Sequence, residues 1–453
     1  MAEIRKALCV LNPQNGYAFT DNEAALLLEK VLASPIRGRG YQGLPLSERW
    51  RAFAEKEGPK ELVCLCSGTC SEALLDANEE AVWTGIALAA KAFGQEEAWV
   101  ALDHERSIPD SRFGIALKCF TFEHTPAAGE ETRLFAMIEG DIPLTRPQPP
   151  YPTERGLFGR PTLIHSAELF AHLPYLLRDG DADTKLVYCS GAVEKPGIYE
   201  VNSDAPLSEL LAEAGAVKPK AVQLGGCCGY LLPVEKAGGV PVYGEAALPD
   251  AIPGDASVRV IGQNECPVRL LKENLRTAYP ASCGRCVFCR EGLYQMYLLM
   301  EDLGAGKGRE TDLPLLKDLA SVIAEQAACD YGRMAGRMVV SALAAFYEEF
   351  EAHLRKKCPA LDCPGMFTLH IDPAKCTGCG DCLSRCPEKA ILGGAGLIHV
   401  VNQERCTQCM ACLPCPADAF LRAGLLKPAG PEQPVPVGSF VPKKKGLQRR
   451  PKV

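Results

Sequence analysis

Eight cysteines near the C-terminus form two regularly spaced runs, and this spacing constrains the fold more than any other feature of the chain. The runs are Cys376-x2-Cys379-x2-Cys382-x3-Cys386 and Cys406-x2-Cys409-x2-Cys412-x2-Cys415, each followed by proline. Three thiolates within seven residues suit one face of an iron–sulfur cubane, so we expect two 4Fe–4S clusters here. Structural zinc is the alternative, but such sites usually pair two separated Cys-x2-Cys knuckles.

The two runs resemble the bacterial two-cluster ferredoxins, in which the fourth cysteine of each run ligates the other cluster. This resemblance implies one cluster on Cys376, Cys379, Cys382 and Cys415, and a second on Cys406, Cys409, Cys412 and Cys386. The second run has only Leu413 and Pro414 before its last cysteine, where the ferredoxin pattern has three residues. Cys415 is therefore the ligand position that departs from the pattern.

The composition describes an ordinary globular protein with room for roughly three domains. Of its 453 residues 47% are hydrophobic, enough for several cores. No apolar run reaches about eighteen residues, so we expect no membrane span, and the N-terminus lacks the apolar stretch of a secretory signal. A net charge of −7 without a basic face argues against nucleic-acid binding. We expect a cytoplasmic protein.

A third set of cysteines lies in the middle of the chain. The 23 cysteines of a long chain without a secretory signal are interpreted as reduced metal ligands in an oxygen-poor cytoplasm. Cys283-x2-Cys286-x2-Cys289 precedes a helical pattern, and the next cysteine is Cys329, forty residues later. Apolar residues recur at helical spacing between them, so a small helical bundle could return Cys329 to the other three. We expect a third 4Fe–4S cluster on these four ligands.

The segment SCGRCVFCREG with its later cysteine resembles the 4Fe–4S motif of the NADH-binding flavoprotein subunit of respiratory complex I. The beta subunits of NAD-linked, electron-bifurcating hydrogenases and formate dehydrogenases carry the same motif. GRGYQGLPLSERW, GEETRLFAMIEGD and GLFGRPTLIHSAELFAHLPYLL are similar to further segments of this family, in the family's order. The ferredoxin tail makes the hydrogenase-type beta subunit the nearer relative.

This resemblance implies an α/β and α+β multidomain fold. Residues 1–180 would form a flavoprotein-like α/β domain, 184–262 a β-grasp module, 267–357 a helical bundle with a 4Fe–4S cluster, 358–425 the linker and the bacterial two-cluster ferredoxin domain, and 426–453 a basic, proline-rich tail. In the first domain AVWTGIALAAKAFG is typical of an amphipathic helix and EAWVAL of a following strand. In the module AVQLGGCCGYLLP indicates one strand.

The flavin site that the family implies is altered at several positions. The family's loop reads G-R-G-G-A-G-F-P, where this chain has GRGYQGLP over residues 38–45. Tyr41 and Gln42 add side chains where glycine allows the flavin ring to approach the backbone. The lysine expected before Trp50 is Arg49. Other polar positions of the family's site correspond here to Leu65, Ser67, Gly68, His165 and Ser166.

We therefore expect no FMN bound in the family's way and, with it, no NADH oxidation. The competing view is that a shifted loop still admits the flavin, because the Gly-Glu-Glu-Thr segment at 129–132 is retained. Gly38, Gly40, Glu130 and Glu131 would then be the residues that bind flavin or NAD(P)H. A solvated surface turn is the other explanation of the two adjacent acids.

The linker before the ferredoxin domain holds a further candidate site. His353, Cys358 and Cys363 offer three soft ligands within eleven residues, which could supply most of a tetrahedral zinc site. Similar beta subunits carry a histidine and two cysteines at this linker. The fourth ligand cannot be identified from the sequence, and a core histidine beside spare thiols is the alternative.

The remaining cysteines are interpreted as buried thiols that pack as small hydrophobic groups. Cys64 and Cys66 should lie on one face of a strand. The others in this class that concern the sites below are Cys70, Cys189, Cys227, Cys228 and Cys266.

Together these features predict an iron–sulfur electron-transfer subunit of a cytosolic multi-subunit oxidoreductase complex, which relays single electrons through three 4Fe–4S clusters between redox partners. The resemblance implies partners such as a 2Fe–2S thioredoxin-like subunit, a hydrogenase, a formate dehydrogenase or another reductase. The alternative is an FMN-containing, NAD(P)H-oxidising subunit of a bifurcating hydrogenase or formate dehydrogenase. A regulatory scaffold with only structural metals is a third class.

Overall fold

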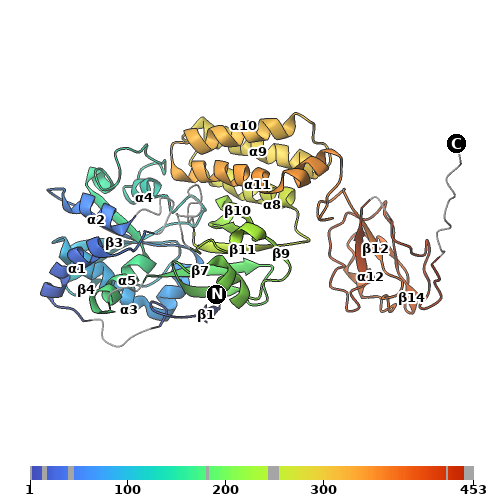
Figure 1. Cartoon of the computed structure of the whole chain (residues 1–453), viewed down its shortest axis with the longest axis horizontal. Helices are drawn as coiled ribbons and strands as arrows, with labels where there is room; N and C mark the ends of the chain where they lie inside the picture. The colour runs from blue at the N-terminus through green and yellow to red at the C-terminus, as the bar shows by residue number, and fades with distance from the viewer. Residues whose placement is uncertain are drawn as a thin grey trace. The chain divides into compact units, whose positions relative to one another are not determined.

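The computed structural model describes residues 3–12, 18–38, 45–179, 183–242, 255–424 and 427–442 (Figure 1). Two compact units make up the chain. The first comprises 1–263, 271–299 and 311–347, and the second comprises 264–270, 300–310 and 348–453. Within the described ranges, no helix combines the length and the apolar character needed to cross a membrane.

A five-stranded sheet forms the core of the first unit, in the order β4-β5-β3-β2-β6. All neighbouring strands are parallel except β4 and β5. The strands are β2 (Glu61–Cys66), β3 (Glu97–Leu102), β4 (Ser111–Arg112), β5 (Ile115–Thr121) and β6 (Thr162–Ser166). The helices around it are α1 (Asp21–Ala33), α2 (Leu46–Ala54), α3 (Gly68–Ala92), α4 (Glu131–Ile138) and α5 (Ala167–Asp179). Because β2, β3 and β6 are parallel, the segments that follow them meet at one edge of the sheet.

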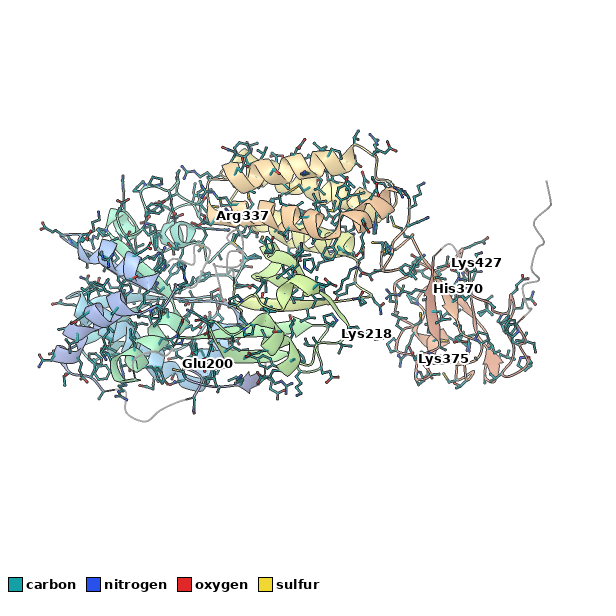
Figure 2. The ribbon with its side chains drawn as sticks, viewed as in Figure 1. Glu200, Lys218, Arg337, His370, Lys375 and Lys427 are labelled. Carbon is teal, nitrogen blue, oxygen red and sulfur yellow. The ribbon has the colours of Figure 1, made fainter. Side chains whose placement is uncertain are left out.

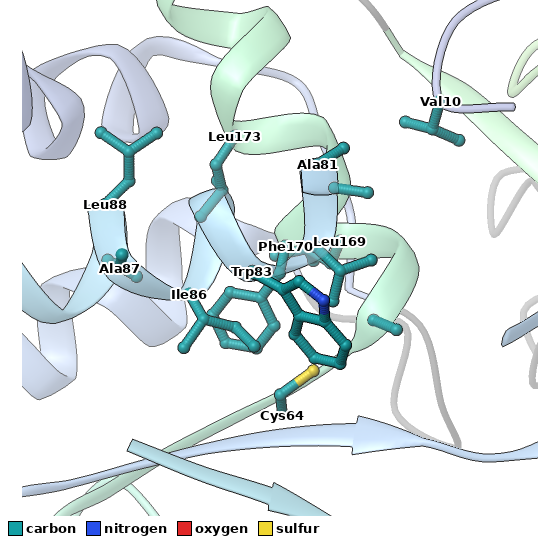
Figure 3. Close-up of a cluster of buried hydrophobic side chains, with 14 of the residues drawn as sticks. Val10, Cys64, Ala81, Trp83, Ile86, Ala87, Leu88, Leu169, Phe170 and Leu173 are labelled. Atoms are coloured by element: carbon teal, nitrogen blue, oxygen red, sulfur yellow. The ribbon is translucent and has the colours of Figure 1, made fainter. Parts of the chain in front are cut away.

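Helix α3 is buried on every side over residues 81–90, so the sequence-based prediction of an amphipathic helix is wrong for this segment. Other helices cover the faces that solvent would otherwise reach. Trp83 of α3 packs above Cys64 of β2 (Figure 3), and both side chains are buried in the same cluster. The Sγ atoms of Cys64 and Cys66 lie 3.6 Å apart. These two thiols therefore pack as hydrophobic groups, as the sequence predicts.

A six-stranded mixed sheet also belongs to the first unit, in the order β1-β8-β7-β11-β9-β10. Its strands are β1 (Ile4–Lys6), β7 (Thr184–Gly191), β8 (Gly197–Asn202), β9 (Pro219–Leu224), β10 (Tyr230–Pro233) and β11 (Ser257–Gly262), with α6 (Leu207–Glu213) and α7 (Val234–Ala237) beside them. The segment predicted as one strand forms two, because β9 and β10 pair antiparallel across the 3-10 turn η2 (Gly226–Cys228). Gly225 and Gly226 have φ values of 92° and 75°, which favour glycine.

Glu200 of β8 (labelled in Figure 2) holds the N-terminal segment against this sheet. Its carboxylate accepts the backbone N–H groups of Leu8 at 2.9 Å, Val10 at 2.8 Å and Leu11 at 3.2 Å. The Thr184 hydroxyl donates to it at 2.6 Å. The Glu200 side chain is fully buried, so these donors replace its hydration.

We expect Glu200→Gln to loosen this segment, because an amide cannot accept all of these bonds and turns a donor toward backbone donors. The expected cost is about 2 kcal/mol, or roughly 30-fold faster exchange of the amide hydrogens at residues 8–11. Hydrogen-exchange mass spectrometry measures this. Glu213→Gln is the matched control, since Glu213 pairs with Lys6 at the surface and should have little effect. Equal exchange in both variants would contradict the assignment.

Four helices follow the second sheet: α8 (Pro267–Ala281), α9 (Val287–Gly304), α10 (Asp312–Gln326) and α11 (Asp330–Leu354). The predicted helical pattern between Cys289 and Cys329 is confirmed by α9 and α10. Gly336 of α11 lets that helix approach α10 closely, because a Cβ atom there would lie 2.4 Å from the backbone nitrogen of Ala324. The end of α10 therefore turns back so that Cys329 lies directly before the next helix.

The second unit contains short paired strands around a cysteine-rich core. The pairs are β12 (Thr368–Ile371) with β16 (Phe420–Ala423), β13 (Ile391–Leu392) with β15 (Val400–Val401), and β14 (Leu397–Ile398) with β17 (Val435–Pro436). The short helix α12 (Asp381–Arg385) carries Cys382. Figure 2 labels His370 on β12 and Lys375, which donates to the Asp418 carbonyl at 3.2 Å.

Candidate iron–sulfur and metal centres

The four cysteines of the central motif meet where α8, α9 and α11 begin or end. Cys283 and Cys286 lie in the turn between α8 and α9, Cys289 in the first turn of α9, and Cys329 directly before α11. Burial raises the pKa of the Cys329 thiol to about 12, and Glu130 and the thiols of Cys289 and Cys283 add to the shift. The structure therefore brings Cys329 to the other three cysteines.

Positive charge and small residues surround this set. Burial opposes ionisation of Cys283, but a hydrogen bond with Thr145 and the nearby Arg133 guanidinium lower its pKa below the usual value. A Cβ atom at Gly332 would lie 3.6 Å from Cys289 Sγ, so glycine leaves space there. Four convergent thiols with a nearby guanidinium form a donor set that fits a 4Fe–4S cluster.

The eight ferredoxin cysteines fall into the two crossed sets. One small cavity is lined by Cys386, Cys406, Cys409 and Cys412, and another by Cys376, Cys379, Cys382 and Cys415. Burial raises the pKa values of Cys382 and Cys412 to about 11, and the other thiols of the same set contribute. The chain thus groups its thiols as the ferredoxin pattern implies.

The shortened arm before Cys415 does not remove this thiol from its set. The Cys415 N–H donates to the Leu413 carbonyl at 2.6 Å in a tight turn, and Arg385 donates to the Pro414 carbonyl at 2.7 Å. On the other side of the cavity, Nδ1 of the buried His399 lies 3.5 Å from Cys376 Sγ. A hydrogen bond to a ligand sulfur is one of the contacts that tune a cluster potential.

A different centre lies where α8 begins and α11 ends. The ligand atoms of Cys266, His353, Cys358 and Cys363 all lie within 4.8 Å of one another, and all four side chains are buried. His353 Nε2 lies 3.3 Å from the Sγ atoms of Cys266 and Cys363, which are themselves 3.5 Å apart. A tetrahedral zinc site with bonds of about 2.0–2.3 Å has edges of roughly 3.5–3.8 Å, so these residues fit the metal.

Hydrogen bonds orient two of these groups. His353 Nδ1 lies 2.6 Å from the Glu349 carbonyl oxygen, which leaves Nε2 to face a metal. The Asp362 N–H donates to Cys358 Sγ at 3.3 Å. Burial alone would lower the pKa of His353, but hydrogen bonds with Cys266 and Cys358 raise it to about 10. This crowding of donors is what a bound cation would relieve.

Cys266 is a correction, because the sequence alone predicts that it is a packed thiol. It lies 87 residues before His353, and only the return of α11 alongside the start of α8 brings the two together. Its N–H donates to the Asp362 carboxylate at 3.2 Å, so the linker also binds its backbone. No local spacing could have identified it.

A cavity of about 330 Å³ opens at the edge of the five-stranded sheet where β2 and β6 end. The first turn of α3, the segment 124–131 and turn η2 line it. Its charged and thiol side chains are His124, Glu130, Glu131, His165, Glu168, Asp255, Asp330, Cys70, Cys227 and Cys228. No lysine or arginine is among the described residues that line it.

A hydrogen-bonded network that sequence reasoning missed lies at this edge. Asp103, which directly follows β3, accepts from the Gly68 N–H at 2.7 Å and the Ser67 hydroxyl at 2.9 Å, and His124 Nδ1 lies at 2.9 Å. Burial opposes ionisation of Asp103, but these hydrogen bonds, with that of His104, hold its pKa well below the usual range. Its place after a parallel strand is the only sequence signal that could have found it.

Comparison with known proteins agrees with this geometry. Residues 269–353 match the model of the NADH-ubiquinone oxidoreductase-F iron-sulfur binding region, 368–421 a 4Fe-4S dicluster domain, and 186–226 an SLBB domain. The chain is 30% identical over 414 residues to NADP-reducing hydrogenase subunit HndC of Solidesulfovibrio fructosivorans, covering 82% of this chain and 84% of the relative. The chain belongs to the NADH-quinone oxidoreductase-F family, which includes these hydrogenase subunits.

Other members of this family are similar over most of their length. NADH-quinone oxidoreductase-F 2 of Rhizobium meliloti (strain 1021) is 30% identical over 378 residues, which are 74% of this chain and 90% of the relative. The crystal structure of an NAD+-reducing [NiFe]-hydrogenase in the H2-reduced state matches with a TM-score of 0.70 and 25% identity, over 78% of this chain and 68% of that one. The predicted multidomain α/β fold with a ferredoxin-like C-terminal domain is confirmed.

The flavin that the oxidoreductase-F family implies would occupy the cavity at the sheet edge, but its lining is unsuitable. The loop with Gly40 lies outside the described residues, and Gly38 is buried. The described lining offers carboxylates and no lysine or arginine to balance a flavin phosphate, and Asp103 already accepts the N-terminal Gly68 N–H of α3. These residues do not fit the phosphate of FMN.

The retained acids of the family's Gly-Glu-Glu-Thr segment have other partners here. Glu130 is buried and accepts from the Arg133 N–H at 2.8 Å, so it caps α4. Burial raises its pKa to about 7. Glu131 pairs with Arg49 at 2.7 Å. The alternative of a solvated surface turn is therefore wrong for Glu130.

Proposed function

We propose that the chain is an electron-transfer subunit of a multi-subunit oxidoreductase, and that it relays single electrons through three 4Fe–4S clusters. The observation that carries this proposal is the grouping of twelve cysteines, distant in sequence, into three sets of four. One cluster would be held by Cys283, Cys286, Cys289 and Cys329, and the other two by the crossed ferredoxin sets. Cubanes bound by thiolates supply one-electron chemistry.

The residues around each set control how a cluster would exchange electrons. The thiols of Cys289 and Cys382 are buried, while Cys379 and Cys409 are exposed at the surface of the second unit. An exposed cluster edge admits a redox partner, whereas burial excludes water and shifts the potential. The ferredoxin unit is therefore the proposed exit or entry point. The partners would be other components of a redox complex, such as a 2Fe–2S thioredoxin-like protein, a hydrogenase or a formate dehydrogenase.

A structural metal completes the proposal. The Cys266, His353, Cys358 and Cys363 set would hold one zinc ion, which has no redox chemistry and would tie the linker to the ends of α8 and α11. The absence of an open ligand position among four protein donors favours a structural role over a catalytic one.

The alternative function is an FMN-containing, NAD(P)H-oxidising subunit. The cavity favours it, because it lies at the sheet edge where ligands bind in such folds. Anaerobic titration separates the two: we expect dithionite to bleach the cluster absorbance and NADH to leave it unchanged, with or without added FMN. Bleaching by NADH at catalytic rates would favour the flavoenzyme.

A further inference from the structure

Two adjacent cysteines, Cys227 and Cys228, lie at turn η2 on the wall of the cavity. Their Sγ atoms are 4.0 Å apart, with Cys227 partly exposed and Cys228 only 5% exposed. The turn is tight, because a Cβ atom at Gly226 would lie 2.4 Å from the Asp255 carboxylate. The prediction that both thiols are packing groups does not explain why the polar cavity admits Cys227.

The pair also contacts the proposed cluster site. A hydrogen bond with Cys227 and then burial raise the pKa of Cys228, and the nearby Cys289 thiol adds to the shift. Tyr331, two residues after Cys329, hydrogen-bonds Cys228. The same pairing lowers the pKa of Cys227, whose thiol is the one that the cavity exposes. The dithiol thus lies against a cluster ligand on one side and the cavity on the other.

We propose that Cys227 and Cys228 form a redox-active dithiol that reduces a small, cationic disulfide in the cavity. The Cys227 thiolate attacks one sulfur of the disulfide, which forms a mixed disulfide and releases the first thiolate. The Cys228 sulfur then attacks Cys227, gives its proton to the second leaving thiolate, and closes the Cys227–Cys228 disulfide. The substrate gains two electrons and the dithiol loses them.

Return to the dithiol takes two electrons and two protons, so this inference rests on the proposed relay as the source of single electrons. A disulfide between neighbouring residues is strained, since their Cα atoms are about 3.8 Å apart and unstrained disulfides need roughly 4.4–6.8 Å. Strain makes the bond easier to reduce, which is the property of labile and catalytic disulfides.

The cavity selects the charge of the substrate. Five carboxylates line it, and no lysine or arginine does among the residues that the structure describes there. Asp255 lies directly beside the turn that carries Cys227. A disulfide with positive ends, such as cystamine, is therefore favoured over one with negative ends, such as dithiodiglycolate.

Full-length protein, purified anaerobically and reduced, is mixed with cystamine and followed by peptide mass spectrometry. We expect wild type to form the Cys227–Cys228 disulfide, with the loss of two hydrogen atoms. Cys228→Ser should accumulate a cysteamine adduct on Cys227, and Cys227→Ser should form none because Cys228 is buried. Cys70→Ser, which removes another thiol of the same cavity, should behave as wild type. Cystamine should react at least about tenfold faster than dithiodiglycolate.

Free thiols at both positions after cystamine treatment would overturn the dithiol, and equal rates with the two disulfides would overturn the substrate class. Iron measured on the same samples separates this test from the relay. Normal iron with unreactive thiols contradicts only the dithiol. Wild-type protein without iron contradicts the relay itself. Loss of iron from Cys227→Ser alone would assign the pair a structural role and also overturn the dithiol.

Discussion

Cys329→Ser is expected to remove about one third of the iron, roughly four of twelve atoms per chain, because it deletes one ligand of one cubane. Cys329 lies forty residues from the other three cysteines in sequence and beside them in the fold. A serine hydroxyl is a much poorer ligand for iron than a thiolate. Colorimetric iron analysis of anaerobically purified protein measures the loss, and electron paramagnetic resonance after dithionite reduction shows which signal disappears.

Cys64→Ser is the matched control, since Cys64 is also a buried cysteine of the first unit. It packs under Trp83 beside Cys66 (Figure 3), so its replacement should cost stability and leave the iron content unchanged. Iron loss from the Cys64 variant, or full iron in the Cys329 variant, would contradict the ligand set.

The second large effect is expected at the four-residue metal set. Cys266→Ser should lower bound zinc from about one per chain to near zero, because a buried tetrahedral site with three ligands binds weakly. We expect amide exchange in residues 354–363 to rise by at least about 100-fold, which corresponds to roughly 3 kcal/mol. A strong zinc chelator should have the same effect on wild type. Elemental analysis and hydrogen-exchange mass spectrometry measure both quantities.

Cys189→Ser controls for the replacement of a buried thiol by a hydroxyl, since Cys189 is fully buried in the six-stranded sheet and belongs to no metal set among the described residues. It should retain zinc and the exchange rates of residues 354–363. Stoichiometric zinc in the Cys266 variant would exclude Cys266 as a ligand. If chelation left the exchange of this segment unchanged in wild type, the metal would have no structural role.

Local spacing predicted the parts of this protein that short segments determine. The ferredoxin runs, the central Cys-x2-Cys-x2-Cys motif and the helices between Cys289 and Cys329 follow from patterns within about forty residues. The crossed grouping that places Cys415 with the first run also followed from such a pattern, because the tight turn at Leu413 makes up for the missing residue.

Features that depend on long-range packing could not be predicted. Cys266 meets His353 only through the return of α11, and Asp103 meets Gly68 only because β2 and β3 are parallel neighbours. Helix α3 carries a pattern typical of a half-exposed helix, but neighbouring helices bury it completely over 81–90. The hairpin turn at Cys227 and Cys228 was missed because its glycines interrupt an otherwise continuous apolar run.

The cavity shows why retained residues alone do not establish a cofactor. Glu130 and Glu131 match the family's flavin segment, yet one caps α4 and the other pairs with Arg49. Local stability explains their presence, and the charge of the whole lining opposes a phosphate group.

Cofactor content of the anaerobically purified chain tests the central claim most directly. Iron is measured by colorimetry, and flavin by fluorescence after acid release. We predict about twelve irons per chain, the sum of three cubanes, and no flavin. The same iron with stoichiometric FMN would contradict the interpretation of the cavity, and iron near eight or below would contradict the relay through three clusters.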